Sequence, residues 1–126
     1  MTDRLQIEQL LRELHAARVD GHLGRLCALF GADATFRIAG ASDRPIAITA
    51  VGIAEIRAWL AVMLKTFKLD RYQLRSMVID GGRAAVHWQA DIHSKITGVV
   101  VPTELVDLVE VSDGRITSYR EFFAPC

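Results

Sequence analysis

The segment Gly114-Arg115-Ile116-Thr117-Ser118-Tyr119-Arg120-Glu121-Phe122-Phe123-Ala124 decides the fold, because it is typical of a strand that closes an antiparallel sheet. The preceding Ser112-Asp113-Gly114 has the composition of a tight turn, so the strand should complete a hairpin. Within the strand, Tyr119 and Glu121 are two residues apart and therefore share one face of the sheet. The closing strand thus presents a phenol and a carboxylate side by side.

Working back from this strand, the chain alternates between apolar and polar residues from Tyr72 onward. Asp80-Gly81-Gly82 marks a second hairpin turn. The expected strand over residues 83–95 shows this alternation most clearly. Its apolar face, which should meet the helices, carries Val86, Trp88, Ala90 and Ile92. The expected strands cover residues 72–80, 83–95, 99–111 and 115–124.

The front of the chain has helical spacing instead. Apolar residues recur every three or four positions, and Asp3 with Gln6 forms a capping-box pattern. Gly31 is placed to end the second helix. We expect helices over residues 3–19, 23–30 and 53–67, a short strand over 33–38 and a loop over 39–51. Helices followed by a meander predict an α+β domain with helices on one face of a curved antiparallel sheet.

Composition narrows the range of partners. A chain of 126 residues suits one domain, and its fifteen basic and fifteen acidic residues show no run of like charge. Neither a nucleic-acid footprint nor a membrane-binding patch is visible, so we expect a small apolar or aromatic ligand. The polar first residues and short apolar runs favour a cytoplasmic protein. Cys27 and Cys126 have neither metal-ligand spacing nor a disulfide pattern.

Histidines on the polar strand face suggest a metal site at first sight. His87 and His93 are six residues apart, which at roughly 3.3 Å per residue is about 20 Å, too far to share one ion. Asp91 is closer to His93, but we expect this face to contact solvent or another subunit and predict no metal and no cofactor. His15 adjoins the apolar stripe of the first helix and faces either solvent or a pocket.

Three features together resemble the SnoaL-like branch of the nuclear transport factor 2-like superfamily. They are the order of elements, the passage Leu29-Phe30-Gly31-Ala32-Asp33-Ala34-Thr35-Phe36, and the ending from Asp113 to Phe123. The resemblance spans the whole chain and implies a conical sheet wrapped by helices around a pocket. That superfamily contains polyketide cyclases, ketosteroid isomerase, scytalone dehydratase and limonene epoxide hydrolase, as well as non-enzymatic binding modules, so the fold does not settle the function.

Alignment of the sequence with limonene epoxide hydrolase without gaps implies which residues line that pocket. The implied set is Leu14, Phe36, Ile38, Leu60, Leu64, Trp88, Ala90, Ile92, Thr103, Leu105, Asp107, Tyr119, Glu121 and Phe123. Trp88, Ala90, Phe36 and Ile38 fall where the hydrolase needs polar catalytic groups, so its mechanism is disfavoured here. The acid that many relatives carry at the end of the first helix corresponds to Val19, or to Asp20 if the register is shifted by one.

Three pocket residues are the candidates for catalysis. Glu121 would be a general acid or base, since desolvation disfavours its charged form; otherwise it pairs at the rim with Arg120, Arg115 or Arg37. Tyr119 either donates to a developing enolate oxygen or is a rim aromatic. Asp107 is either a second pocket acid, whose charge would raise the proton affinity of Glu121, or a side chain that points away from the helices.

The sequence therefore predicts a protein that binds a hydrophobic or aromatic, polyketide- or steroid-like molecule. If it is an enzyme, we expect cofactor-free proton transfer next to a carbonyl, as in isomerisation or aldol-type cyclisation. The alternative is a non-catalytic ligand-binding or dimerising module. The outer sheet face carries Val99, Val101, Val106 and Leu108, and because relatives commonly dimerise there, we expect a homodimer.

Overall fold

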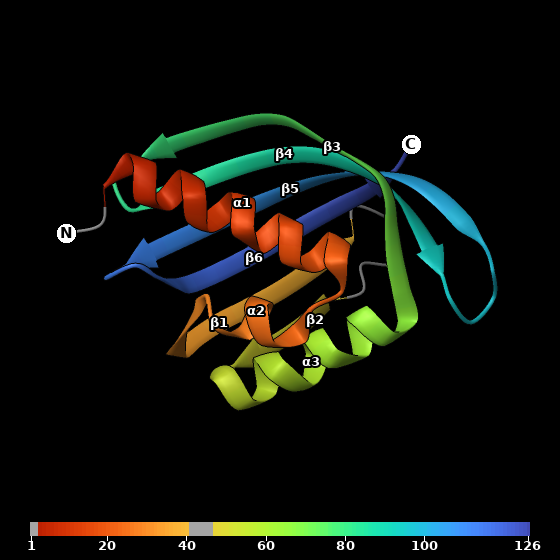
Figure 1. Ribbon diagram of the computed structural model, residues 1–126, viewed down its shortest axis with the longest axis horizontal. Coiled ribbons are helices and arrows are strands. Elements are labelled where there is room, and N and C mark those ends of the chain that lie inside the picture. The colour runs from red at the N-terminus through yellow and green to blue at the C-terminus, as the bar shows by residue number, and fades with distance from the viewer. Residues whose placement is uncertain (1–2, 41–46) are drawn as a thin grey trace.

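The computed structural model describes residues 3–40 and 47–126. Within these residues, three helices cover one face of a curved six-stranded sheet that does not close on itself (Figure 1). This is the α+β arrangement that the sequence predicts. None of the described helices is both long and apolar enough to cross a membrane.

The elements follow one another in two groups, with the longer strands in the second half of the chain. The helices are α1 (Arg4–Asp20), α2 (Leu23–Cys27) and α3 (Ile53–Thr66). The strands are β1 (Phe30–Gly40), β2 (Ala47–Val51), β3 (Phe67–Asp80), β4 (Arg83–Ser94), β5 (Val100–Ser112) and β6 (Arg115–Pro125). In the sheet they lie in the order β2-β1-β6-β5-β4-β3, and only the β1–β6 pairing among them is parallel.

Helix α1 begins and ends as its sequence predicts. The Asp3 side chain accepts a hydrogen bond from the Gln6 backbone at 2.8 Å, and the Gln6 side chain accepts one from the Asp3 backbone at 3.3 Å. Gly21 ends the helix in the left-handed conformation, with φ of 70°, which glycine adopts at low cost. The stripe of Ile7, Leu11 and Leu14 is buried against the sheet.

The second helix is shorter than expected, and the prediction that it continues to Phe30 and ends at Gly31 is wrong. Both residues belong to β1, where Phe30 pairs with Ile116 of β6. Ile116 donates its backbone N–H to the Leu29 carbonyl at 2.8 Å. Pairing with a distant strand therefore outweighs the local helical spacing, and Phe30 is buried among other aromatic rings.

Strand β2 lies where the sequence predicts only a loop. It pairs antiparallel with β1, from Thr35 opposite Val51 to Ala39 opposite Ala47. Of the expected loop, residues 41–46 lie outside the described residues. At the other end of α3, β3 starts at Phe67 rather than at Tyr72. The ranges of β4, β5 and β6 agree with the predicted ones to within one residue, whereas β1 begins three residues before and ends two residues after the predicted 33–38.

The concave face of the sheet holds the core. Strand register sets Trp88 opposite Leu105, Asp107 opposite Glu121 and, across the parallel pair, Phe36 beside Tyr119. The rings of Phe36 and Tyr119 stack with centroids 5.5 Å apart and planes inclined by 9°. Helix α1 lies along this face (Figure 1), and burial alternates along β4, β5 and β6 for most of their length.

The turn after β3 offers a test of the backbone packing. A Cβ atom at Gly82 would lie 2.8 Å from the Val111 carbonyl oxygen, and Val111 already donates to the Gly82 carbonyl at 2.7 Å. We expect Gly82→Ala to lower the free energy of unfolding by about 1–3 kcal/mol in urea titrations, because this steric clash is with backbone. Gly31→Ala is the control, since its Cβ would meet nothing closer than 3.5 Å. Equal losses of unfolding free energy in the two variants would contradict a steric clash at Gly82.

Candidate functional site

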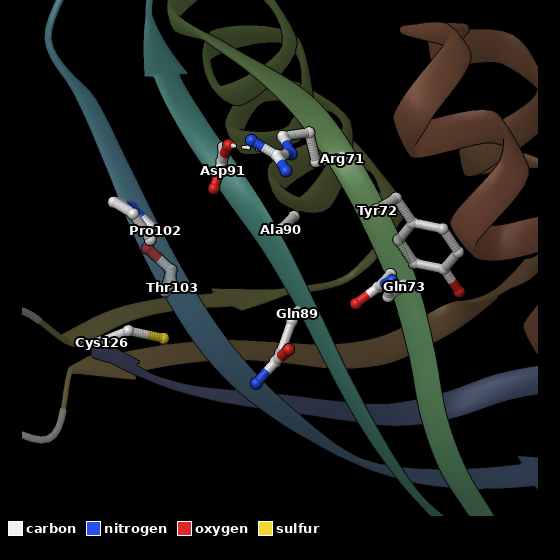
Figure 2. A pocket seen from close by; sticks show the side chains of 9 residues that line it. All are labelled: Arg71, Tyr72, Gln73, Gln89, Ala90, Asp91, Pro102, Thr103 and Cys126. Carbon is white, nitrogen blue, oxygen red and sulfur yellow. Dashed lines mark ion pairs between the residues drawn. The ribbon is translucent and has the colours of Figure 1, made fainter.

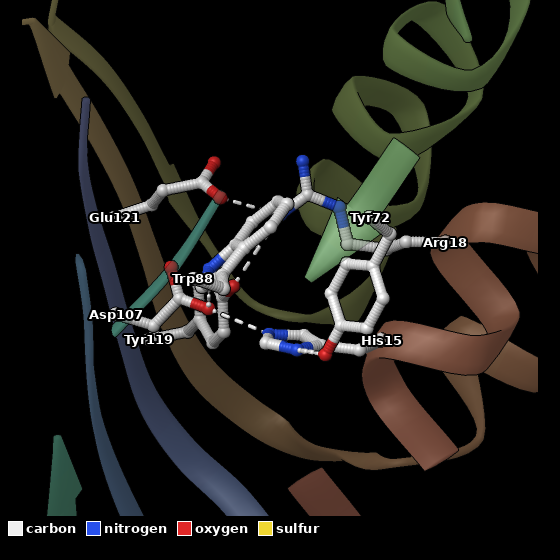
Figure 3. Close-up of polar contacts among 7 residues, drawn as sticks. All are labelled: His15, Arg18, Tyr72, Trp88, Asp107, Tyr119 and Glu121. Atoms are coloured by element: carbon white, nitrogen blue, oxygen red, sulfur yellow. Dashed lines mark hydrogen bonds and ion pairs between the residues drawn. The ribbon is translucent and has the colours of Figure 1, made fainter. Parts of the chain in front are cut away.

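Seven side chains from α1, β3, β4, β5 and β6 meet between the helix and the concave face (Figure 3). We call them the buried cluster; they are His15, Arg18, Tyr72, Trp88, Asp107, Tyr119 and Glu121. Five members are at most 3% exposed, whereas Arg18 and Tyr72 are partly buried. A cluster that buries an arginine, a histidine and two carboxyl groups needs each of them to be paired.

Local geometry explains why these residues converge. His15 and Arg18 are three positions apart on α1 and therefore lie on one helix face. Asp107 and Glu121 are direct cross-strand partners on β5 and β6, and Tyr119 is two residues before Glu121 on the same face. The approach of α1 to the sheet then brings the two sets together.

Glu121 is held by an arginine of the helix. Arg18 donates from Nη1 to Glu121 Oε1 at 2.5 Å and to the Tyr119 hydroxyl at 3.5 Å. The guanidinium carbon also lies 5.1 Å from the Trp88 ring centroid, a cation–π arrangement. The Arg18 side chain is 9% exposed and that of Glu121 is 3% exposed, so this ion pair is part of the core.

The expectation that Glu121 pairs at the rim with Arg120, Arg115 or Arg37 is wrong. Arg120 and Arg37 are opposite each other in the parallel pair, on the other face of the sheet, and Arg115 donates to the Ala28 carbonyl at 2.7 Å. The sequence carried a signal for the actual partner. Ile7, Leu11 and Leu14 form the buried stripe of α1, and Arg18 stands at the next position of the same stripe.

Asp107 points toward the helices, which decides between the two orientations that the sequence left open. Its Oδ2 atom accepts hydrogen bonds from Trp88 Nε1 at 2.9 Å and lies 3.0 Å from His15 Nε2. Its Oδ1 atom is buried and has no hydrogen-bond partner in the described part of the chain. Trp88 and His15 thus hold the Oδ2 atom of Asp107, whereas its Oδ1 atom has no such contact among the described residues.

His15 is buried rather than at a pocket mouth, and it connects two other members. Its Nε2 atom faces Asp107, and its Nδ1 atom lies 2.5 Å from the Tyr72 hydroxyl. A carboxylate only accepts, so in the neutral imidazole Nε2 carries the proton and Nδ1 accepts from the Tyr72 hydroxyl. Sequence reasoning missed Tyr72, whose inward orientation follows a β-bulge next to Arg71, a residue with positive φ of 54°.

Burial changes the acid–base properties of the cluster. Burial raises the pKa of Glu121 to about 7, Arg18 opposes this change, and the nearby Asp107 adds to it. Burial lowers the pKa of Arg18, but Glu121 and the other acidic groups raise it by more, so the guanidinium stays charged. Burial, Asp107 and Glu121 together raise the pKa of Tyr119 well above its ordinary value.

The residues expected to line a pocket lie on the concave side but are packed against one another. Leu64, Ile92 and Phe123 are partly buried. The others are buried; they are Leu14, Phe36, Ile38, Leu60, Trp88, Ala90, Thr103, Leu105, Asp107, Tyr119 and Glu121.

An open pocket of about 460 Å³ lies between the ends of β3, β4 and β5 (Figure 2). It shares only Ala90 and Thr103 with the residues expected to line a pocket. Its lining combines polar and apolar surface and consists of Arg71, Tyr72, Gln73, Gln89, Ala90, Asp91, Pro102, Thr103 and Cys126.

The polar groups on the outer face and at the end of α1 have local partners. His87 lies 2.5 Å from Glu104, and His93 lies 3.7 Å from Asp70. Among the described residues, no three histidine, cysteine, aspartate or glutamate side chains gather as metal ligands would. Asp20 accepts from Arg25 at 2.8 Å at the surface, so it does not supply the family's acid at the end of the first helix.

Solved structures of other proteins share the fold of this chain. A Bacillus subtilis protein provisionally named an isomerase superposes with a TM-score of 0.82 at 21% identity, covering 98% of this chain and 89% of the other. An NTF2-like protein from Burkholderia xenovorans LB400 gives 0.81 at 24% identity, with 98% and 92% covered. An M. tuberculosis epoxide hydrolase of the limonene epoxide hydrolase-like type gives 0.75 at 17% identity, with 94% and 83% covered. These similarities establish the fold.

Sequence comparison supplies the family. No curated protein matches the chain by sequence. The family model described as a SnoaL-like domain matches residues 11–119, which include every member of the buried cluster except Glu121. The match covers most of the chain, and its fold is that of the NTF2-like structures above. The chain therefore belongs to the SnoaL-like domain family.

Proposed function

We propose that this protein catalyses cofactor-free proton transfer at a carbon next to a carbonyl group in a small apolar or aromatic molecule. The observation that carries the proposal is the cross-strand carboxyl pair, Asp107 and Glu121, buried beside Arg18. Isomerisation and aldol-type cyclisation both require such a transfer. The SnoaL-like family and the isomerase name of a structural neighbour support the same class of reaction.

A charge count explains why this pair suits proton transfer. With His15 neutral, Arg18 contributes one positive charge, and Asp107 and Glu121 contribute two negative charges. A net buried charge is unfavourable, so the cluster gains stability by taking up one proton. Burial is the largest cause of the raised pKa of Glu121, about 7, and the charge of Asp107 adds to it. A carboxyl group that titrates near neutral pH can both accept a proton from carbon and return it.

Each remaining group then has a role in the reaction. Tyr119 stays protonated because its pKa is raised, so its hydroxyl can donate to the oxygen that becomes negative in the enolate. Arg18 contacts both Tyr119 and Glu121, and its charge stabilises negative charge on either side. Glu121 moves the proton, and Tyr119 polarises the carbonyl.

A second candidate is a ligand-binding module without catalysis. The observation that favours it is the closure of the buried cluster, whose polar groups are largely satisfied by one another. The open pocket is lined by neither Glu121 nor Tyr119. Under this alternative, the ion pair of Arg18 and Glu121 only joins the helix to the sheet.

An exchange experiment separates the two candidates. Cyclic and aromatic ketones that raise the melting temperature would be incubated with the protein in D2O, and deuterium at the α carbon followed by NMR. We expect the wild type to catalyse exchange and Glu121→Gln to lose at least about 100-fold of the rate, the usual weight of a general base. Glu110→Gln, on the exposed face of β5, is the control. Ketone binding without exchange in the wild type would favour the binding module.

The pKa of Glu121 also makes a stability prediction. Because the folded-state pKa is about 7 and the ordinary value is 4.5, the folded protein holds a proton that the unfolded chain releases between these pH values. This stabilisation is fully present below pH 4.5 and is lost as pH rises through about 7. We expect the free energy of unfolding of the wild type to fall relative to Glu121→Gln by up to about 3 kcal/mol over this range. If the free energies of unfolding of the wild type and of Glu121→Gln changed with pH in parallel, the raised pKa of Glu121 would be contradicted.

We further propose a homodimer formed through the outer face of the sheet. Val78, Val106 and Phe122 lie on this face and are 64%, 36% and 37% exposed, which is costly for apolar side chains without cover. The expectation that Val101 lies there is wrong, because its cross-strand partner Ile92 is on the concave face with Trp88, and Val99 precedes β5. Sedimentation equilibrium at micromolar concentration should give twice the chain mass of 14.0 kDa. Val106→Glu should shift the distribution toward monomer, and a wild type found only as a 14.0 kDa species would refute the proposal.

A further inference from the structure

A carboxyl group that is 2% exposed needs a route by which protons reach it. We propose that Tyr72, His15 and Asp107 form a relay that carries protons between the solvent and the carboxyl pair of Asp107 and Glu121. This inference rests on the proposed function, because the relay would exchange with solvent the proton that Glu121 takes from carbon. The relay residues lie on β3, α1 and β5, and Figure 3 shows them in one line of contacts.

Hydrogen-bond distances join each member of the relay to the next. The Tyr72 hydroxyl is 2.5 Å from His15 Nδ1, and His15 Nε2 is 3.0 Å from Asp107 Oδ2. Asp107 lies directly opposite Glu121 in the sheet and raises the pKa of that residue, so the two carboxyl groups are electrostatically coupled. The unpartnered Oδ1 atom of Asp107 remains available for a proton shared within the pair.

Other routes out of the cluster are closed by chemistry. Of its seven members, only Arg18 and Tyr72 are partly exposed. Arg18 cannot pass protons on, since its guanidinium stays protonated, and the Trp88 indole only donates. Tyr72 also lines the open pocket, and its ring extends from there toward α1 (Figure 2). The route therefore leads through Tyr72.

The transfer balances at each atom. As the Tyr72 oxygen takes a proton from solvent, its own hydroxyl proton passes to His15 Nδ1, and the proton on Nε2 passes to Asp107. The carboxyl pair gains one proton, the solvent loses one, and Tyr72 ends as a phenol. His15 is left in its other tautomer, and the return passage restores it. One outward and one inward transfer per turnover would therefore complete a cycle.

The charges around Tyr72 suit this role. Burial and Asp107 raise the pKa of the phenol, whereas Arg12 and Arg18, both on α1, lower it by less. Tyr72 therefore keeps its proton at neutral pH and can hand it to His15. Before the transfer, the Asp107 carboxylate keeps the proton of the neutral imidazole on Nε2, from which Asp107 itself then accepts it.

Infrared spectroscopy tests the relay without a substrate. The carbonyl stretching band of protonated Glu121, identified by its loss in Glu121→Gln, would be followed after a rapid pH drop through 7. We expect Tyr72→Phe to leave the titration midpoint in place and to slow the rise of the band by at least about tenfold. His15→Gln, which also interrupts the relay, should slow it similarly. Gln73→Ala changes the neighbouring residue of β3, which lines the same open pocket but lies outside the relay, and should retain the wild-type rate.

The two readouts keep the relay and the proposed function separate. Wild-type rates in both Tyr72→Phe and His15→Gln would overturn the relay, whatever the titration midpoint. A midpoint at the ordinary carboxyl pKa would instead remove the basis of the proposed function, while the rate comparison would still decide the relay. A rate lowered equally by Gln73→Ala would also overturn the relay, because the effect would then follow any change in the lining of the open pocket.

Discussion

The ion pair between Arg18 and Glu121 is the interaction on which the interior of this protein depends. It joins α1 to β6 across the core, with both side chains at most 9% exposed. Removing one partner of such a pair leaves an uncompensated buried charge and typically costs about 3–5 kcal/mol. Burial, with the nearby Asp107 adding to it and Arg18 opposing it, gives Glu121 its affinity for a proton near neutral pH.

The buried cluster draws its polar groups from both layers of the fold. His15 and Arg18 come from α1, whereas Asp107 and Glu121 come from β5 and β6. Trp88, Ala90, Phe36 and Ile38, which are buried on the same side of the sheet, contribute apolar surface. The acid–base groups of this chain therefore meet only where α1 packs against the two carboxyl groups of the sheet.

Much of the fold could be predicted because its signals are local. The capping box at Asp3, the strand alternation around Trp88 and the turn at Asp113 each depend on a few neighbouring residues. The errors arose where a distant partner decided the conformation. Phe30 enters β1 because it pairs with Ile116, and residues 47–51 form a strand because β1 lies beside them. Neither partner is visible in a short window of sequence.

By itself, the sequence determined the fold class, the family resemblance and the placement of Tyr119 and Glu121 on one face of the closing strand, because alternation and turns are properties of adjacent residues. Only the tertiary structure decided what Glu121 contacts. Arg18 is 103 positions away from it, and Tyr72 and Asp107 are 57 and 92 positions from His15. Proton affinity depends on burial and on charges a few ångströms away, and the packing of α1 against the sheet sets both.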